Sequence, residues 1–181
     1  MALVVPKPCF ISEVMAFKDK LMAGVPELIT EDGRISMFRD KVGYWDSHEI
    51  SYLIQALVRD YQWFGNAGSC AVAKRLADGF IANGLTVTIG TEAAFLLLAE
   101  ATGEPRYRRF LEDGCRIGDD IRSYHRASKQ VGVKHVYTWL ARAHAQVCYY
   151  DMVRRTDPCD DAPYLAAADE AISRACGPYM S

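Results

Sequence analysis

Residues 44–66 read YWDSHEISYLIQALVRDYQWFGN, and their apolar residues recur at the spacing of one face of an α-helix. The series follows positions i, i+3, i+4, i+7, i+8 and i+11: Ile50, Leu53, Ile54, Leu57, Val58 and Tyr61. It stops at Phe64-Gly65-Asn66, and glycine with asparagine is typical of a helix end. The stretch therefore predicts an amphipathic helix followed by a tight turn.

The same pattern of helix, short turn and second helix recurs along the chain. A partner helix should follow the first turn and end at Asn83-Gly84, with an apolar face formed by Val72, Leu76, Phe80 and Ile81. An apolar helix over 91–101 precedes the corner Thr102-Gly103-Glu104-Pro105 and the segment RYRRFLEDGCRI, in which Tyr107, Phe110 and Leu111 should point inward. The third pair is predicted from HVYTWLARAHAQVCYYDMVRR and YLAAADEAISRA. These hairpins form a degenerate internal repeat, which is typical of stacked helical arrays.

We expect one domain over 1–181, with hairpins at 44–84, 85–120 and 135–176. Residues 1–43 should hold an N-terminal helix and an irregular segment that turns at Asp32-Gly33. That helix is expected over 11–29, with Ser12 as its N-cap, a kink or end at Pro26, and an apolar face. This face consists of Val14, Phe17, Leu21, Val25 and Leu28.

No set of residues alternates with the period of a β-sheet, and LTVTIG at 85–90 is a short β-like run. The inner helices, over 91–101 and 136–150, are apolar nearly all round, which favours burial on two sides. The predicted fold class is all-α, with about three stacked helical hairpins forming a partial (α/α) toroid.

Composition excludes several classes of protein. With 181 residues, 50% apolar and 24% charged, the chain has the composition of a soluble globular domain. Its net charge of -2 gives no footprint for nucleic acid or an anionic membrane. It has no apolar run of about 18 residues and no signal peptide in MALVVPKPCF. The six cysteines form no C-x-x-C pair, so we expect no metal, no cofactor, and reduced thiols in a cytoplasmic protein.

The segment that precedes the first amphipathic face is dense in functional side chains. His48 could contact a ligand with Asp46 or Glu49 beside it, and Tyr44 and Trp45 could supply an apolar platform. The alternative is capping: Asp46 or Ser47 can accept a backbone N–H, and Glu49 complements the helix dipole. Both interpretations can hold together.

Two further helix starts carry candidate residues. Glu92 follows Thr91, which we expect to be an N-cap, and the repeat would direct Glu92 to the same mouth as His48. His135 opens the third inner helix, with Trp139 four residues later on the same face. An aromatic at that spacing is more often core than ligand contact. His144 in mid-helix is expected to be packed or on the surface, and Asp119-Asp120 to be solvated.

The segments YWDSHEISYLIQALVRDYQWFGN, TIGTEAAFLLLAEATGEPRYRRFLE and KHVYTWLARAHAQVCYYDMVRRTD resemble the six-hairpin glycosidases, and most nearly the β-L-arabinofuranosidase family. In that family a histidine opens an inner helix at two positions, which His48 and His135 match, and T-G-D corners resemble those at Thr102 and Thr156. The match covers about residues 40–176. The family's zinc-bound cysteine nucleophile and acid/base carboxylate follow the third hairpin, where this chain ends, so no catalytic residue is carried over.

The resemblance implies a carbohydrate-active protein, similar to a truncated glycoside hydrolase, that binds or hydrolyses a sugar in a central cleft. The alternative is a non-catalytic helical-repeat module whose concave face binds a protein or small ligand. Convergence of His48, Glu92 and His135 on one pocket would favour the first. Half a toroid leaves its end hairpins uncovered, so we also expect a homo-oligomer.

Overall fold

The computed structural model describes residues 8–35, 44–119 and 136–156, together with residues 166, 169, 170, 172 and 173. In this part of the chain the fold is all-α, as predicted, and its one β contact is an isolated antiparallel bridge between Ile29 and Ile35. It contains six α-helices and a 3-10 helix: α1 (Pro8–Gly24), η1 (Val25–Leu28), α2 (Tyr44–Phe64), α3 (Ala67–Ala82), α4 (Thr91–Thr102), α5 (Pro105–Cys115) and α7 (Val136–Thr156).

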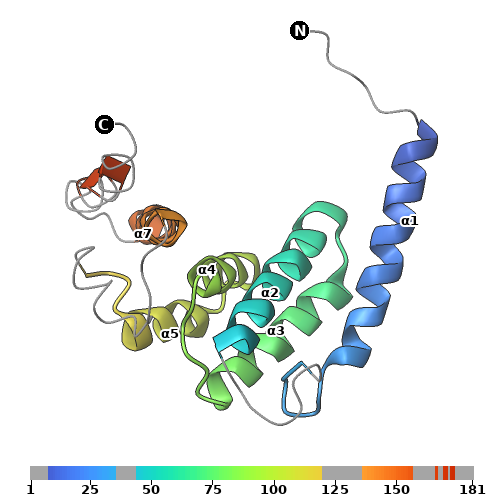
Figure 1. The fold of residues 1–181 in the computed structure, drawn as a ribbon, viewed down its shortest axis with the longest axis horizontal. Helices are drawn as coiled ribbons and strands as arrows, with labels where there is room; N and C mark the ends of the chain where they lie inside the picture. Colours follow the sequence, from blue (N-terminus) through green and yellow to red (C-terminus); the bar gives the residue numbers. More distant parts are fainter. Residues whose placement is uncertain are drawn as a thin grey trace, which may run out of the picture.

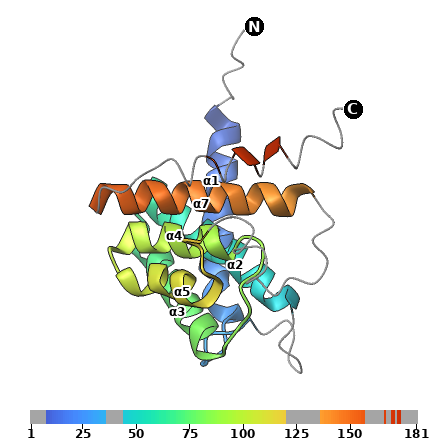
Figure 2. The same ribbon diagram turned by 90° about the vertical axis from the view of Figure 1, so that its left-hand side faces the viewer.

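The helices form an inner row and an outer row. The inner helix α2 packs against α3 and α4, and α4 packs against α5 and α7. The inner helices α2, α4 and α7 run in the same general direction, and α3 and α5 return below them (Figures 1 and 2). The predicted hairpins α2–α3 and α4–α5 are therefore present. Most of the third hairpin's second helix lies outside the described residues, and toroidal curvature stays a prediction.

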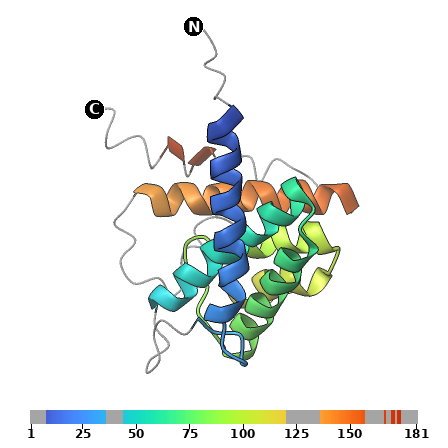
Figure 3. The same ribbon diagram turned by 90° about the vertical axis from the view of Figure 1, so that its right-hand side faces the viewer.

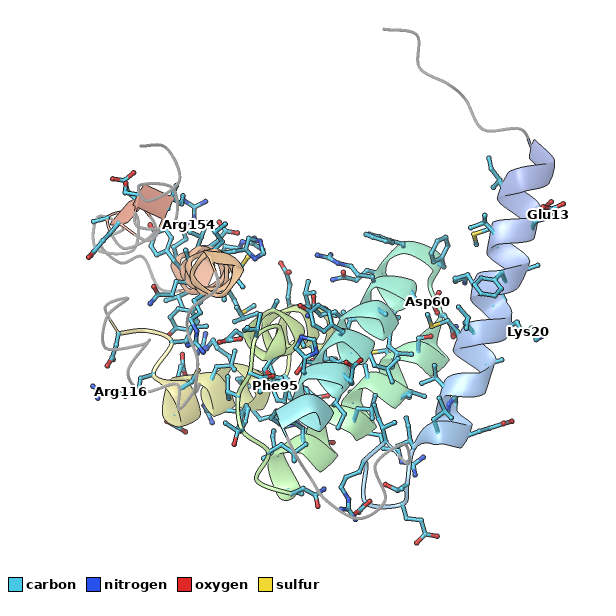
Figure 4. The ribbon with its side chains drawn as sticks, viewed as in Figure 1. Glu13, Lys20, Asp60, Phe95, Arg116 and Arg154 are labelled. Carbon is cyan, nitrogen blue, oxygen red and sulfur yellow. The ribbon has the colours of Figure 1, made fainter. Side chains whose placement is uncertain are left out.

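The core lies between the two rows. Phe95 on α4 is at its centre: ring centroids of Phe80, Phe110 and Tyr107 lie 5.4, 4.8 and 6.1 Å from that of Phe95 (Figure 4). The face of α2 predicted from the opening stretch is buried, including Ile50, Ile54, Leu57 and Val58. Burial of this face against α3 and α4 holds the inner row in place.

The turns that join the helices use the residues that the sequence indicates. Gly65 has a φ of 70° between α2 and α3. The side chain of Asn66 then accepts the Ser69 backbone N–H at 3.4 Å as the N-cap of α3. α1 ends before Pro26, as expected, because proline cannot continue the i to i−4 hydrogen-bond ladder.

Three predicted N-caps are wrong. α1 begins at Pro8, so Ser12 lies inside the helix, and α2 begins at Tyr44, so Asp46 and Ser47 lie in its first turn. The N-cap of α4 is Gly90, with a φ of 93°, because glycine reaches this left-handed backbone without strain. Thr91 instead accepts the Thr88 backbone N–H on its hydroxyl at 3.0 Å.

The N-terminal helix is attached to the body differently from the prediction. Of its predicted apolar face only Val25 is buried, whereas Val14, Phe17, Leu21 and Leu28 are exposed. α1 crosses α2 on the outside of the molecule (Figure 3). It reaches the body through Lys18, which hydrogen-bonds to Asp60 on α2, and through the partly buried Met22.

The turn after η1 packs directly on α3 through two glycines. A Cβ added to Gly79 would lie 2.6 Å from the Cα of Gly33, closer than side-chain atoms approach. This contact requires glycine at Gly79, in the last turn of α3.

Candidate functional site

A cavity of about 700 Å³ opens between α1, α2, α4 and α7. We call it the groove. Its volume is in the range of sites that bind small molecules or the side chains of a bound peptide. The apolar lining residues are Met22, Ala56, Trp63, Phe64, Ala93, Leu96, Leu97, Val147, Cys148 and Met152. The polar lining residues are Lys18, Gln55, Arg59, Asp60, Glu100, His144, Asp151 and Arg155.

The groove-facing side of α2 is the side that the core does not use. Gln55, Arg59 and Trp63 recur every four residues, and they line the groove. Residues three or four apart share a helix face, so the pattern that buries Ile54 and Val58 leaves this second face available. Trp63 is 69% exposed, which is unusual for so large an apolar residue.

Asp60 connects three helices at one end of the groove. Its Oδ1 accepts a hydrogen bond from Lys18 Nζ at 2.9 Å, and its Oδ2 accepts bonds from Ser69 Oγ at 2.5 Å and Asn66 Nδ2 at 2.8 Å. Burial alone would raise the pKa of Asp60, but hydrogen bonds from Ser69, Lys18 and Asn66 outweigh it and lower the pKa. Asp60 is therefore ionised at neutral pH and ties α1 and the start of α3 to α2.

The two arginines that line the groove differ in whether they form ion pairs with carboxylates. Arg155 pairs with Glu100 at 2.7 Å and also with Asp151. Arg59 donates to Gln62 Oε1 at 2.8 Å, and its guanidinium lies 5.6 Å from the Trp63 ring centroid. Within the described chain no carboxylate forms an ion pair with Arg59. Arg59 is thus a positive charge beside an exposed aromatic ring.

His144 and Cys148 lie one turn apart on α7, with Nε2 and Sγ 3.6 Å from each other. Burial raises the pKa of the Cys148 thiol, and the nearby Asp151 and Glu100 raise it further. The neutral thiol is a poor nucleophile, so this pair does not favour covalent catalysis. No cluster of three or more His, Cys, Asp or Glu residues suited to a metal ion occurs in the described ranges.

His48 lies on the groove-facing side of α2 but two turns before Gln55. Its side chain is 22% exposed, its Nδ1 is 3.4 Å from Glu49 Oε1, and its ring centroid is 4.8 Å from that of Tyr52. The groove lining includes neither His48 nor the exposed Glu49. The groove is therefore displaced towards the carboxyl ends of the inner helices, away from the predicted mouth.

Glu92 is buried rather than exposed at a mouth. Its Oε1 is 3.8 Å from Nη1 of Arg142 on α7, and both side chains are almost inaccessible to solvent. The neighbouring Thr91 hydroxyl lies 2.9 Å from that of Ser51, which holds the amino ends of α2 and α4 together. Glu92 thus joins α4 to α7 and does not line the groove.

The remaining predicted residues are not tested by these contacts. His135 lies outside the described residues, as do the side chains of Tyr44, Trp45, Asp46 and Trp139. Their backbones, except that of His135, belong to the first turns of α2 and α7.

Sequence reasoning missed the groove residues, although one signal for them was present. Arg59 and Trp63 share the face of α2 opposite its apolar series, and an exposed tryptophan beside an arginine is typical of a binding surface.

Searches of family models, curated proteins and solved structures each found no match to this chain. No helix in the described part combines the length and the apolarity needed to cross a bilayer.

Proposed function

We propose that the protein is a non-catalytic binding module whose groove holds an amphipathic helix of a partner protein, and that an acidic side chain of this helix pairs with Arg59. The observation that carries the proposal is the combination of an apolar floor with Arg59 and the exposed Trp63 at its edge. A groove of this kind is one of the common ways in which proteins recognise helices.

The floor suits the apolar face of a helix. Leu96 and Leu97 come from α4, and Met22 and Met152 come from the flanking helices α1 and α7. Methionine side chains adapt their shape to an incoming partner because their three torsions and polarisable sulfur tolerate many contacts. In Figure 4 the helices α1 and α7 stand on either side of α2 and α4.

The charges of the groove favour an anionic partner. Lys18 and Arg155 already pair with carboxylates, whereas Arg59 has no such pair among the described residues. A carboxylate docked at Arg59 would form a charge-assisted hydrogen bond next to the Trp63 ring, and tryptophan and arginine are the residues that most often dominate binding energy.

The same hydrogen bonds do not favour Asp60 or Asp151 as a general acid. The Asp60 network lowers the pKa of that carboxyl, and hydrogen bonds from Arg155 and Arg154 lower the pKa of Asp151. Both groups are ionised near neutral pH, whereas a general acid must hold its proton there.

A panel of fluorescein-labelled helical peptides tests the proposal. The peptides carry leucine and methionine at positions i, i+3, i+4 and i+7, with either glutamate or glutamine at one flanking position. Fluorescence anisotropy should show saturable binding that favours the glutamate peptides. Arg59→Gln should weaken their binding about 10-fold, the equivalent of about 1.4 kcal/mol, and should leave the glutamine peptides unchanged.

Arg109→Gln is the matched control, because Arg109 lies on α5, in the outer row, and is exposed. Absence of binding by any peptide, or equal binding of both sets with no effect of Arg59→Gln, would refute the proposal. If a single-chain anionic amphiphile such as dodecanoate binds more tightly than every peptide, the ligand of the groove is a small molecule and not a helix.

A carbohydrate is the second candidate ligand, and the position of His48 favours it. His48 and Tyr52 share the α2 face that continues to Trp63, so polar and aromatic side chains follow one another along it. A thermal-shift screen against mono- and oligosaccharides tests this function. A sugar that stabilises the wild type but not His48→Ala would support it, and a hit unaffected by that change would remove His48 from the site.

A further inference from the structure

The exposed side of α1 carries an apolar stripe with the spacing of a coiled-coil seam. Val14, Phe17 and Leu21 are separated by three and four residues and are 47%, 62% and 52% exposed. None of the three lines the groove, so the proposed helix partner would not cover them. α1 is also the outermost described helix at its end of the molecule (Figures 1 and 3).

The stripe has charged residues of opposite sign on its outer flank. With Val14 and Leu21 at heptad position a and Phe17 at d, Glu13 and Lys20 occupy successive g positions. Both are exposed and point away from the other helices in Figure 4. The opposite flank contains Lys18, which faces α2 and bonds to Asp60.

These charges select one arrangement of two α1 helices. In an antiparallel pair, g positions face g positions, so packing of Val14 on Phe17 of a second copy brings Glu13 next to Lys20 of that copy. Two-fold symmetry makes this contact twice. In a parallel pair Glu13 would instead face Lys18 of the second copy, and Lys18 already forms ion pairs with Asp60 and Asp19 of its own chain.

We propose that the apolar stripe of α1 is a homodimer interface, in which two copies of this chain pair their α1 helices antiparallel, with Glu13 of each against Lys20 of the other. The stripe from Val14 to Leu21 spans little more than one heptad, so the dimer is weak and reversible, in the micromolar range. The interface is separate from the groove, and it forms whether or not a partner helix is bound.

Sedimentation velocity of the full chain over a range of micromolar concentrations tests the proposal. The wild type should show a concentration-dependent shift from monomer to dimer. Glu13→Lys and Lys20→Glu should each raise the dimer dissociation constant about 10-fold, because each change creates two like-charge contacts by symmetry. The double variant Glu13→Lys/Lys20→Glu should return it to near the wild-type value.

Two further variants complete the experiment. Arg109→Glu changes the net charge as Lys20→Glu does but lies on α5, so it should leave the dimer unchanged. Phe17→Glu should abolish the dimer while circular dichroism shows unchanged helix content. A wild type that stays monomeric at all concentrations overturns the proposal, and so does a double variant that fails to recover the dimer.

Discussion

Removing the carboxylate of Asp60 should destabilise the protein more than any other single change in the groove. The side chain of Asp60 is 2% exposed, and it accepts hydrogen bonds from α1, from the turn after α2 and from α3. Asp60→Ala leaves the Ser69 hydroxyl and the Asn66 amide without this acceptor. It also removes the hydrogen bond by which Lys18 connects α1 to α2.

The expected loss follows from these bonds. A hydrogen bond to a charged group contributes about 1.5–3 kcal/mol, and two such bonds from Ser69 and Asn66 do not add fully. We therefore expect Asp60→Ala to lower the free energy of unfolding by about 3–4 kcal/mol. For a chain of this length that corresponds to a fall in Tm of about 10 °C. Asp60→Asn keeps an acceptor oxygen and should lose about half as much.

The contribution of Asp60 to the free energy of unfolding should decrease as the pH falls. The folded-state pKa of Asp60 is lowered, so the stability it contributes is fully present above its unfolded pKa of about 3.9 and is lost as the pH falls through the folded value. Urea denaturation at neutral and acid pH should show the gap between wild type and Asp60→Asn closing below about pH 4. Asp113→Ala, on the exposed side of α5, is the control. A loss below about 1 kcal/mol in Asp60→Ala, or a gap that stays constant with pH, would refute the reasoning.

Three other changes have defined outcomes. Gly79→Ala should destabilise by about 1–3 kcal/mol in urea titrations despite its better helix propensity, because its Cβ would lie 2.6 Å from the Cα of Gly33; a stabilised variant would contradict this contact. Glu92→Ala should lower the free energy of unfolding by about 3–5 kcal/mol, because the guanidinium of Arg142 would stay in the interior without this carboxylate. Glu92→Leu/Arg142→Leu should recover most of that loss, and a double variant as unstable as Glu92→Ala would contradict the pairing of the two charges. Burial raises the pKa of the Cys115 thiol, so iodoacetamide followed by mass spectrometry should modify it only after unfolding, and modification in the native state would place it at the surface.

Local pattern was sufficient to predict most helices. The period of Ile50, Ile54 and Val58 indicates α2, and glycine near asparagine or proline marks the corners after it. The starts of helices were less predictable. At α4 the sequence offered both Gly90 and Thr91, and the choice between them depends on the backbone conformation of the preceding turn.

The candidate site was predictable only in part. His48 does lie on the open face of α2, as a helical wheel allows, but the position of the groove along that face depends on where α1 and α7 cross it. Glu92 occupies a helix start of the kind expected for a ligand contact, yet Arg142 on another helix takes its carboxylate into the interior. No local feature near Glu92 identifies that partner.

The amino-acid sequence by itself determined that the chain is helical, where its apolar faces lie and where most helices end, because these properties depend on residues a few positions apart. The tertiary structure alone decided what each face meets. It covers the apolar face of α2 with α3 and α4, leaves that of α1 in solvent, and joins Asp60 to Lys18 and Gly33 to Gly79. An amphipathic pattern states that one side of a helix is apolar, but the partner of that side is set by packing between segments far apart in the chain.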